Sequence, residues 1–122
     1  CFIIYLLMNN ITTFFKTLSD FTRLRILMLL HREGALCVCE LCEALDTHQP
    51  MISRHLAEMR KSGLVDNQRQ SRWIFYSIPS DMPEWSVNVL REVAGGADDP
   101  GQFAKDHERL SMMQGRPNRA VA

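Results

Sequence analysis

Three cysteines, Cys37, Cys39 and Cys42, lie close together in the string CVCELC. Thiolates are soft ligands, and they select soft metal and metalloid ions. Cysteines this close in sequence are poorly placed to join distant parts of a chain by disulfides, and free thiols persist in the reducing cytoplasm. The sequence therefore predicts a cytoplasmic protein with a candidate site for a soft ion.

The spacing of the three cysteines also suggests a mechanism. In a regular helix, at about 100° per residue, Cys39 and Cys42 lie roughly 60° apart on one face, whereas Cys37 falls on the far side from Cys39. The three sulfurs then meet on one pyramidal ion only if the first helical turn is distorted. We therefore expect an ion to unwind the start of this helix and to disturb the helix that follows it, which is how a switch works.

Three other interpretations of the cysteines stay open. Structural zinc usually takes four ligands, and His31, His48 or Glu40 could supply the fourth, although no second pair of cysteines follows the first. Free cysteines are also common as small apolar core residues. A thiol redox switch is the third alternative.

The elements that would position the cysteines are mostly helical. Apolar residues recur at three- and four-residue steps, as in amphipathic helices. Ser19 or Asp20 can cap the second helix and Gly34 can end it. The expected helices span about residues 9–18, 20–33, 37–45, 49–63 and 85–95. The third and fourth are short and joined by a tight polar turn, which is the helix-turn-helix pattern.

Beyond Gly63 the apolar period changes to two on both sides of a polar tip at 67–72, which predicts a β-hairpin or wing. The predicted fold class is therefore mainly α with a small β-hairpin, a dimeric winged helix-turn-helix over 10–95. We expect a flexible segment at 1–9 and a disordered, polar tail at 96–122. The chain opens with Cys1, and Met8 is an expected true start.

Charge patterning favours DNA as the partner only locally. The chain has 14 Lys and Arg against 14 Asp and Glu, so its net charge of zero gives no global attraction to nucleic acid. Between residues 47 and 78, five basic residues against two acidic ones leave a local charge of +3, which can neutralise phosphates. The alternative is a solvated helix face and turn.

Two groups of side chains are candidates for DNA contact. A recognition helix presents its N-terminal half to base edges, and a wing reaches the flanking backbone or minor groove. On the recognition helix the candidates are Gln49, Ser53, Arg54 and His55, and on the wing they are Arg69, Gln70 and Arg72.

A homodimer is expected because one small module makes few DNA contacts. The helices at 9–18 and 85–95 carry large apolar residues for its interface, unless these complete the monomer core. They are Phe14, Phe15, Trp85, Val89 and Leu90.

Two function classes are disfavoured. No nucleophile elbow, phosphate-binding glycine loop or paired-carboxylate pattern occurs, so we do not expect an enzyme. The apolar run at 2–8 is far shorter than the roughly 20 residues that span a bilayer, so we expect no membrane partner.

The string LCVCELCEALDTHQPMISRHLAEMRKSGLV at 36–65 resembles the ArsR/SmtB family, in particular its arsenical-resistance operon repressors, and the resemblance covers about 10–95. It implies a homodimeric repressor, without a permanent cofactor, that binds operator double-stranded DNA. As(III) or Sb(III) is then the inducer, bound by Cys37, Cys39 and Cys42. The alternative is a zinc-stabilised or thiol-redox-sensing DNA-binding or interaction module.

The resemblance maps the DNA-reading positions onto Gln49, Ser53, Arg54 and His55. Ala35 stands where relatives often carry Glu, and His48 stands where a Ser often caps the recognition helix, so Thr47 is the expected substitute cap. Residues 84–93 contain no histidine, so no second zinc site is expected there.

Overall fold

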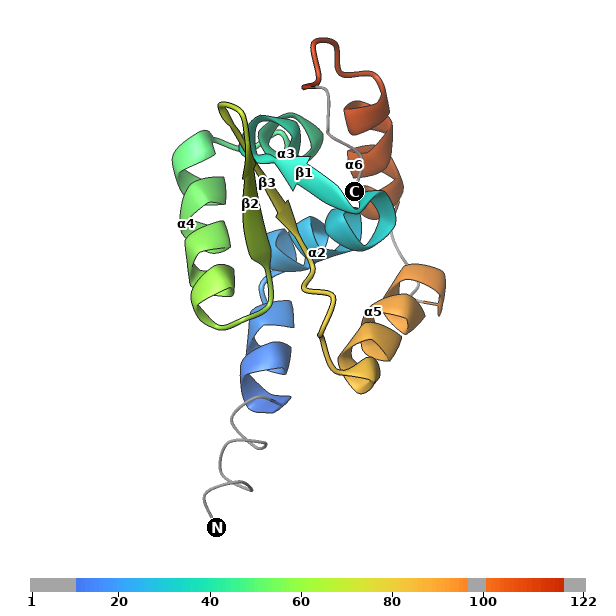
Figure 1. The fold of residues 1–122 in the computed structure, drawn as a ribbon. Helices are drawn as coiled ribbons and strands as arrows, with labels where there is room; N and C mark the ends of the chain where they lie inside the picture. The colour runs from blue at the N-terminus through green and yellow to red at the C-terminus, as the bar shows by residue number, and fades with distance from the viewer. Residues whose placement is uncertain (1–10, 97–100, 118–122) are drawn as a thin grey trace.

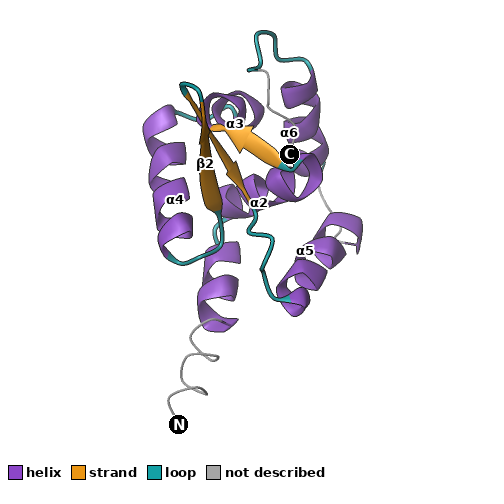
Figure 2. Cartoon of the chain, in the orientation of Figure 1, coloured by secondary structure: helices purple, strands orange, loops and turns teal. Residues whose placement is uncertain are grey.

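The elements follow one another in a mainly helical order. The computed structural model describes residues 11–96 and 101–117. Residues 11–18 are helical, and the elements after them are α2 (Phe21–Glu33), β1 (Ala35–Cys37), α3 (Val38–Leu45), α4 (Gln49–Lys61), β2 (Asp66–Gln70), β3 (Trp73–Ser77), α5 (Glu84–Gly96) and α6 (Gln102–Ser111). Figures 1 and 2 show the small sheet in the middle, with α4 on one side and α6 on the other. The expected flexible segment 1–9 and the start at Met8 lie outside the described residues.

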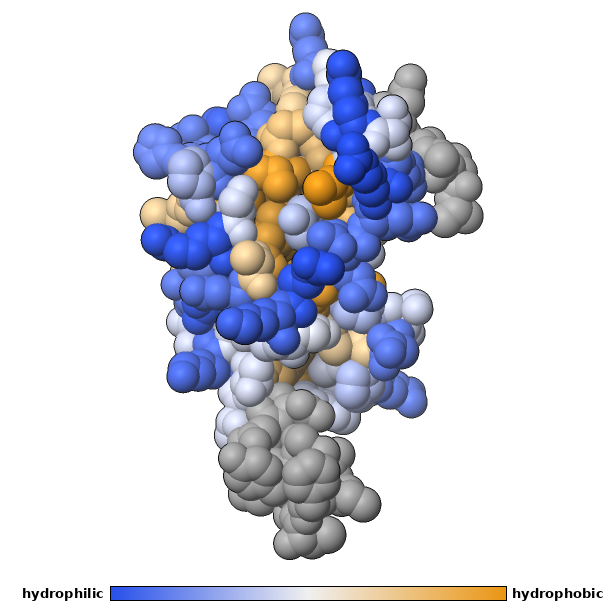
Figure 3. All heavy atoms as spheres, turned by 60° about the vertical axis from the view of Figure 1, so that its left-hand side comes forward, coloured by the Kyte–Doolittle hydropathy of each residue, from blue (hydrophilic) through white to orange (hydrophobic). Residues whose placement is uncertain are grey.

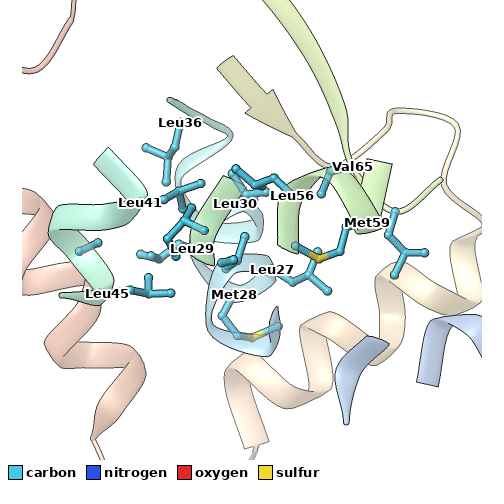
Figure 4. Packing of buried hydrophobic residues seen from close by; sticks show 14 of the residues in the cluster. Leu27, Met28, Leu29, Leu30, Leu36, Leu41, Leu45, Leu56, Met59 and Val65 are labelled. Atoms are coloured by element: carbon cyan, nitrogen blue, oxygen red, sulfur yellow. The ribbon is translucent and has the colours of Figure 1, made fainter. Parts of the chain in front are cut away.

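Helix α2 is the buried centre of the fold. Its residues 26–30 are all at most 5% exposed, and leucines of the neighbouring elements, among them Leu41 and Leu56, pack around it (Figure 4). The Asp20 side chain accepts a hydrogen bond from the backbone N–H of Arg23, and Gly34 ends the helix at a φ of 93°. Both predicted boundaries of this helix are thus confirmed.

The sheet contains the predicted hairpin and one strand that was not predicted. Its order is β1-β3-β2, antiparallel throughout, so β2 forms one edge. The strand that was not predicted is β1, which has only three residues, too few to show an alternating pattern. Cys37 therefore ends a strand and pairs with Phe75 of β3, and the helix predicted to start at Cys37 starts one residue later, at Val38, with Cys37 as its N-cap.

The helix-turn-helix consists of α3 and α4, joined by residues 46–48. Asp46 has a left-handed backbone, with a φ of 52°, and this conformation ends α3. The N-cap of α4 is His48, whose side chain makes no capping hydrogen bond. Thr47 does not substitute as the cap, because its Oγ1 donates to the carbonyl oxygen of Leu45, 3.0 Å away.

The expectation of a disordered tail is wrong for residues 101–117. Helix α6 packs on α2 and α3 and buries Leu110. The Asp106 carboxylate is 1% exposed and receives two hydrogen bonds from the Arg25 guanidinium, at 2.7 and 2.8 Å. This hydrogen bond raises the pKa of Arg25. The segment is held by this ion pair together with apolar contacts of Phe103, Leu110 and Met113 with the core, and its composition does not reveal the distant partner Arg25.

No helix in the ranges 11–96 and 101–117 has both the length and the apolar character needed to cross a membrane.

We expect Asp106→Ala to lower the free energy of unfolding by about 3 kcal/mol, because it leaves the Arg25 charge without its partner in a largely buried position. Urea denaturation measures the change. Glu108→Ala, at an exposed position of the same helix, is the control and should change stability by less than about 0.5 kcal/mol. Equal stability of the two variants would show that the ion pair does not fasten α6.

Candidate thiol site and nucleic-acid interface

Cys37 and Cys39 lie side by side at the start of α3. Cys37 is the N-cap of this helix and has an extended backbone, with φ −86° and ψ 169°. Its Sγ is 2.7 Å from the Sγ of Cys39. The expected placement of Cys37 on the far side of the helix is therefore wrong, because the residue precedes the helix and does not follow the helical phase.

All three predicted cysteines line one groove. Cys37 is buried, Cys42 is half-buried and Cys39 is exposed, so the groove is open to solvent at Cys39. Its other walls come from α3, α4, the wing and the C-terminal segment, with the lining residues Val38, Glu43, Gln49, Arg72, Trp73, Ile74 and Met113. Among the described residues, no three His, Cys, Asp or Glu side chains already form a group that could hold a metal. The three sulfurs must therefore move to share an ion.

The two less exposed thiols keep their protons at neutral pH. Burial, together with the hydrogen bond to Cys39, raises the pKa of Cys37 to about 12. Burial and the neighbouring Cys39 also raise the pKa of Cys42. A divalent cation that needs thiolates must displace these protons, which weakens its binding at neutral pH.

A buried carboxylate belongs to the first turn of α3. Glu40 is 0% exposed, and its Oε1 accepts a hydrogen bond from the backbone N–H of Cys37 at 2.9 Å. Its Oε2 accepts from Nε of Arg116. Sequence reasoning considered Glu40 only as a zinc ligand and missed Arg116, which lies in the segment expected to be disordered.

The predicted recognition-helix residues do not all share one face of α4. Ile52, Leu56 and Met59 point into the core. Gln49 and Arg54 are exposed, and Ser53 is half-buried. His55 is half-buried, and its Nδ1 is buried without a hydrogen-bond partner.

The predicted wing residues lie at the tip of the β2–β3 hairpin. Arg69 and Arg72 are exposed and Gln70 is half-buried. The Arg69 Nε donates to the carbonyl oxygen of Ser71 at 3.1 Å, and the Arg72 guanidinium lies 5.0 Å from the centre of the Trp73 ring. Figure 3 shows hydrophilic residues over most of one face of the molecule, with a hydrophobic strip between them.

The apolar residues expected at a dimer interface divide into two groups. Phe14 and Leu90 belong to the core, and Val89 is half-buried. Phe15 is 50% exposed and Trp85 is 38% exposed, and their rings stack with centres 6.3 Å apart. The exposed pair thus joins residues 11–18 to α5 at the surface.

Comparison with known proteins identifies similar regulators. The sequence profile described as "bacterial regulatory protein, arsR family" matches residues 20–67. The arsenic resistance transcriptional regulator ArsR1 of Pseudomonas putida is 41% identical over 108 residues, which are 88% of this chain and 83% of the relative. This relative is named as a transcriptional regulator, not as an enzyme.

Two solved structures share the fold. The antimony-specific transcriptional repressor AntR is 27% identical with a TM-score of 0.60, over 69% of this chain and 73% of that one. The homodimeric winged helix-turn-helix DNA-binding domain Mb0332 of Mycobacterium bovis is 25% identical with a TM-score of 0.62, over 73% of this chain and 79% of that one.

Proposed function

The chain belongs to the arsR family of bacterial regulatory proteins, and we propose that it is a repressor that binds operator double-stranded DNA as a homodimer. In this proposal As(III) or Sb(III) binds Cys37, Cys39 and Cys42 and releases the DNA. The names of the relatives support a response to arsenic or antimony. The reducing cytoplasm, where thiols stay free, is the proposed setting.

One observation carries the proposal: the three thiols share a groove with residues of both proposed DNA-contacting elements. Gln49, at the start of α4, and Arg72, at the wing tip, line the groove together with the cysteines. An ion bound by the thiols would therefore lie beside the start of the recognition helix and the tip of the wing. A ligand that moves the residues lining this groove would therefore displace parts of both proposed DNA-contacting elements.

The chemistry of trivalent arsenic suits protonated thiols. Arsenous acid, As(OH)₃, exchanges each hydroxyl group for one cysteine sulfur, and the thiol proton leaves with the hydroxyl as water. Three such exchanges form three As–S bonds and release three water molecules, with no change in oxidation state and no net release of protons. The raised thiol pKa values of Cys37 and Cys42 therefore do not oppose this reaction as they oppose binding of a dication.

Ligand binding need not unwind α3, contrary to the expectation from helical spacing. Cys37 and Cys39 are already adjacent, so the remaining movement brings Cys42 and this pair together. Helix α3 is joined to α4 by only three residues and packs against it. A shift of α3 is therefore passed to α4, and an ion that favours the shifted state weakens DNA binding by linkage.

The structure gives less support to zinc and to redox sensing. The carboxylate of Glu40, a candidate fourth zinc ligand, is already bonded to the Cys37 N–H and to Arg116. The Cys37 and Cys39 sulfurs are close, but the raised pKa of Cys37 keeps that thiol protonated, so Cys39 would have to supply the reactive thiolate for a disulfide.

Cys39→Ser should abolish release of DNA by arsenite while leaving the DNA affinity of the ligand-free protein within about twofold of wild type. The exposed side chain is replaced by a similar one, so only the soft ligand is lost. Fluorescence anisotropy on operator DNA under reducing conditions measures both quantities. Cys1→Ser removes the other cysteine of the chain and is the matched control. A Cys39→Ser protein that still responds, or stoichiometric zinc in purified wild type, would sink the proposal.

Arg54→Ala should weaken operator binding roughly tenfold, because Arg54 is exposed on α4 and has the donors for a base or phosphate contact. Arg32→Ala, which removes the same charge from an exposed position on α2, should have an effect below about twofold. Anisotropy titrations at two salt concentrations test the pair. Equal losses in the two variants would mean that α4 makes no special contact.

Phe15→Glu should weaken the homodimer by at least about tenfold, since it places a charge in the proposed apolar interface with Trp85. Sedimentation velocity over a concentration series measures the monomer–dimer equilibrium. Met112→Glu is the control, because Met112 is 72% exposed after α6, away from the Phe15–Trp85 pair. If the Phe15 variant dimerises as tightly as the Met112 variant, the interface lies elsewhere.

A further inference from the structure

The segment after α5 holds α3 at both ends. At the C-terminal end, Nε of Arg109 donates to the carbonyl oxygen of Glu43 at 2.9 Å, and its Nη2 lies 3.5 Å from the Asp46 carboxylate. At the N-terminal end, Arg116 pairs with Glu40. Helix α3, which carries two of the three thiols of the groove, is thus bracketed by two arginines of one segment.

The two arginines make contacts of different kinds. Arg109 and Glu43 are 45% and 50% exposed, so water and salt screen their interaction. The Glu40 side chain is 0% exposed and that of Arg116 only 29%. A buried carboxylate needs a charged or hydrogen-bonding partner to remain ionised in place. Arg116 therefore stabilises the Glu40 carboxylate where it accepts the Cys37 N–H.

The residues around Arg116 also reach the wing. Gly115, Arg116 and Pro117 line a hollow together with the wing-tip residues Gln70, Ser71, Arg72 and Trp73. Met113, three residues before Arg116, lines the thiol groove. Residues 113–117 thus border both the thiol groove and the wing tip, and they include Arg116, the partner of Glu40.

We propose that Arg116 is a positioning residue that sets how readily the thiol site takes its inducer. This inference rests on the proposed function. Because the three sulfurs do not yet form a group that could hold an ion, binding must move Cys37, Cys42 or both. Movement of the Cys37 backbone breaks the hydrogen bond from its N–H to Glu40, and the Arg116 ion pair, which holds Glu40 in place, resists that movement. Arg116 therefore stabilises the ligand-free arrangement and opposes inducer binding.

Removal of the Arg116 charge should make inducer binding tighter. In the reduced full-length protein, we expect Arg116→Gln to lower the dissociation constant for arsenite about tenfold, within the range typical of allosteric coupling. The arsenite concentration that releases half of the operator DNA should fall by a similar factor. Calorimetry measures the first quantity and anisotropy the second. Arg116→Lys keeps the charge and should stay within about threefold of wild type.

Arg109→Gln is the matched control. It removes one positive charge from the same segment, at the other end of α3 and in an exposed pair. We expect it to change the arsenite dissociation constant by less than about twofold. A tenfold effect of Arg109→Gln would assign the response to net charge, and it would overturn the role of Arg116.

A double-mutant cycle with Glu40→Gln separates positioning from general stability. The amide keeps an acceptor for the Cys37 N–H but carries no charge, so it needs no arginine and spares the fold a buried unpaired carboxylate. Glu40→Gln alone should tighten arsenite binding, and adding Arg116→Gln should then change it less than twofold. Residues that act through one contact show such non-additivity. If Arg116→Gln alone is too unstable to measure, the comparison of Glu40→Gln with the double variant remains, and a change above twofold between these two would overturn the proposal.

The outcomes distinguish the two levels of inference. If wild type binds arsenite and releases DNA, but Arg116→Gln has the same arsenite affinity as wild type, only the role of Arg116 is overturned. Additive effects of Glu40→Gln and Arg116→Gln overturn it as well. A wild-type protein that does not bind arsenite overturns the proposed function and this inference together.

Discussion

The backbone of Cys37 is constrained by three interactions at once. It ends β1 in register with Phe75 of β3, it is the N-cap of α3, and its N–H donates to the buried carboxylate of Glu40. No other described cysteine is held in this way. Because the same residue belongs to the sheet and caps the helix, a displacement of its backbone cannot remain local. The wing strand and the helix-turn-helix both depend on where Cys37 lies.

Polar contacts position the remaining parts around this point. The Arg25 guanidinium bonds both to Asp106 of α6 and to the carbonyl oxygen of Leu45, at the end of α3. The central helix α2 thus fixes both α3, which carries Cys39 and Cys42, and α6, which packs on α3. Hydrogen bonds of this kind have strict geometry, whereas apolar packing tolerates sliding. They define the position of α3 more sharply than its short apolar face would.

The sequence was sufficient where periodicity extends over several turns. The stripe of α2, its cap at Asp20 and its end at Gly34 were predictable, as were α4 and the hairpin. A three-residue strand has no detectable period, so β1 was missed and Cys37 was placed in the wrong element. Helix α6 was missed because its apolar face is short, with Phe103 and Leu110 seven residues apart, and because its ion pair joins charges distant in sequence, 81 residues apart for Arg25 and Asp106. Long-range partners of this kind leave no local signal.

The edge of the sheet has a consequence for solubility. Strand β2, with the sequence DNQRQ, lies at the edge and contains no apolar residue. Exposed edge strands are templates for pairing with other chains, and charged side chains on them discourage such pairing. Asp66 and Arg69 place one charge of each sign along this edge. The charges along β2 therefore protect the molecule against fibril-like growth through the outer strand of its wing.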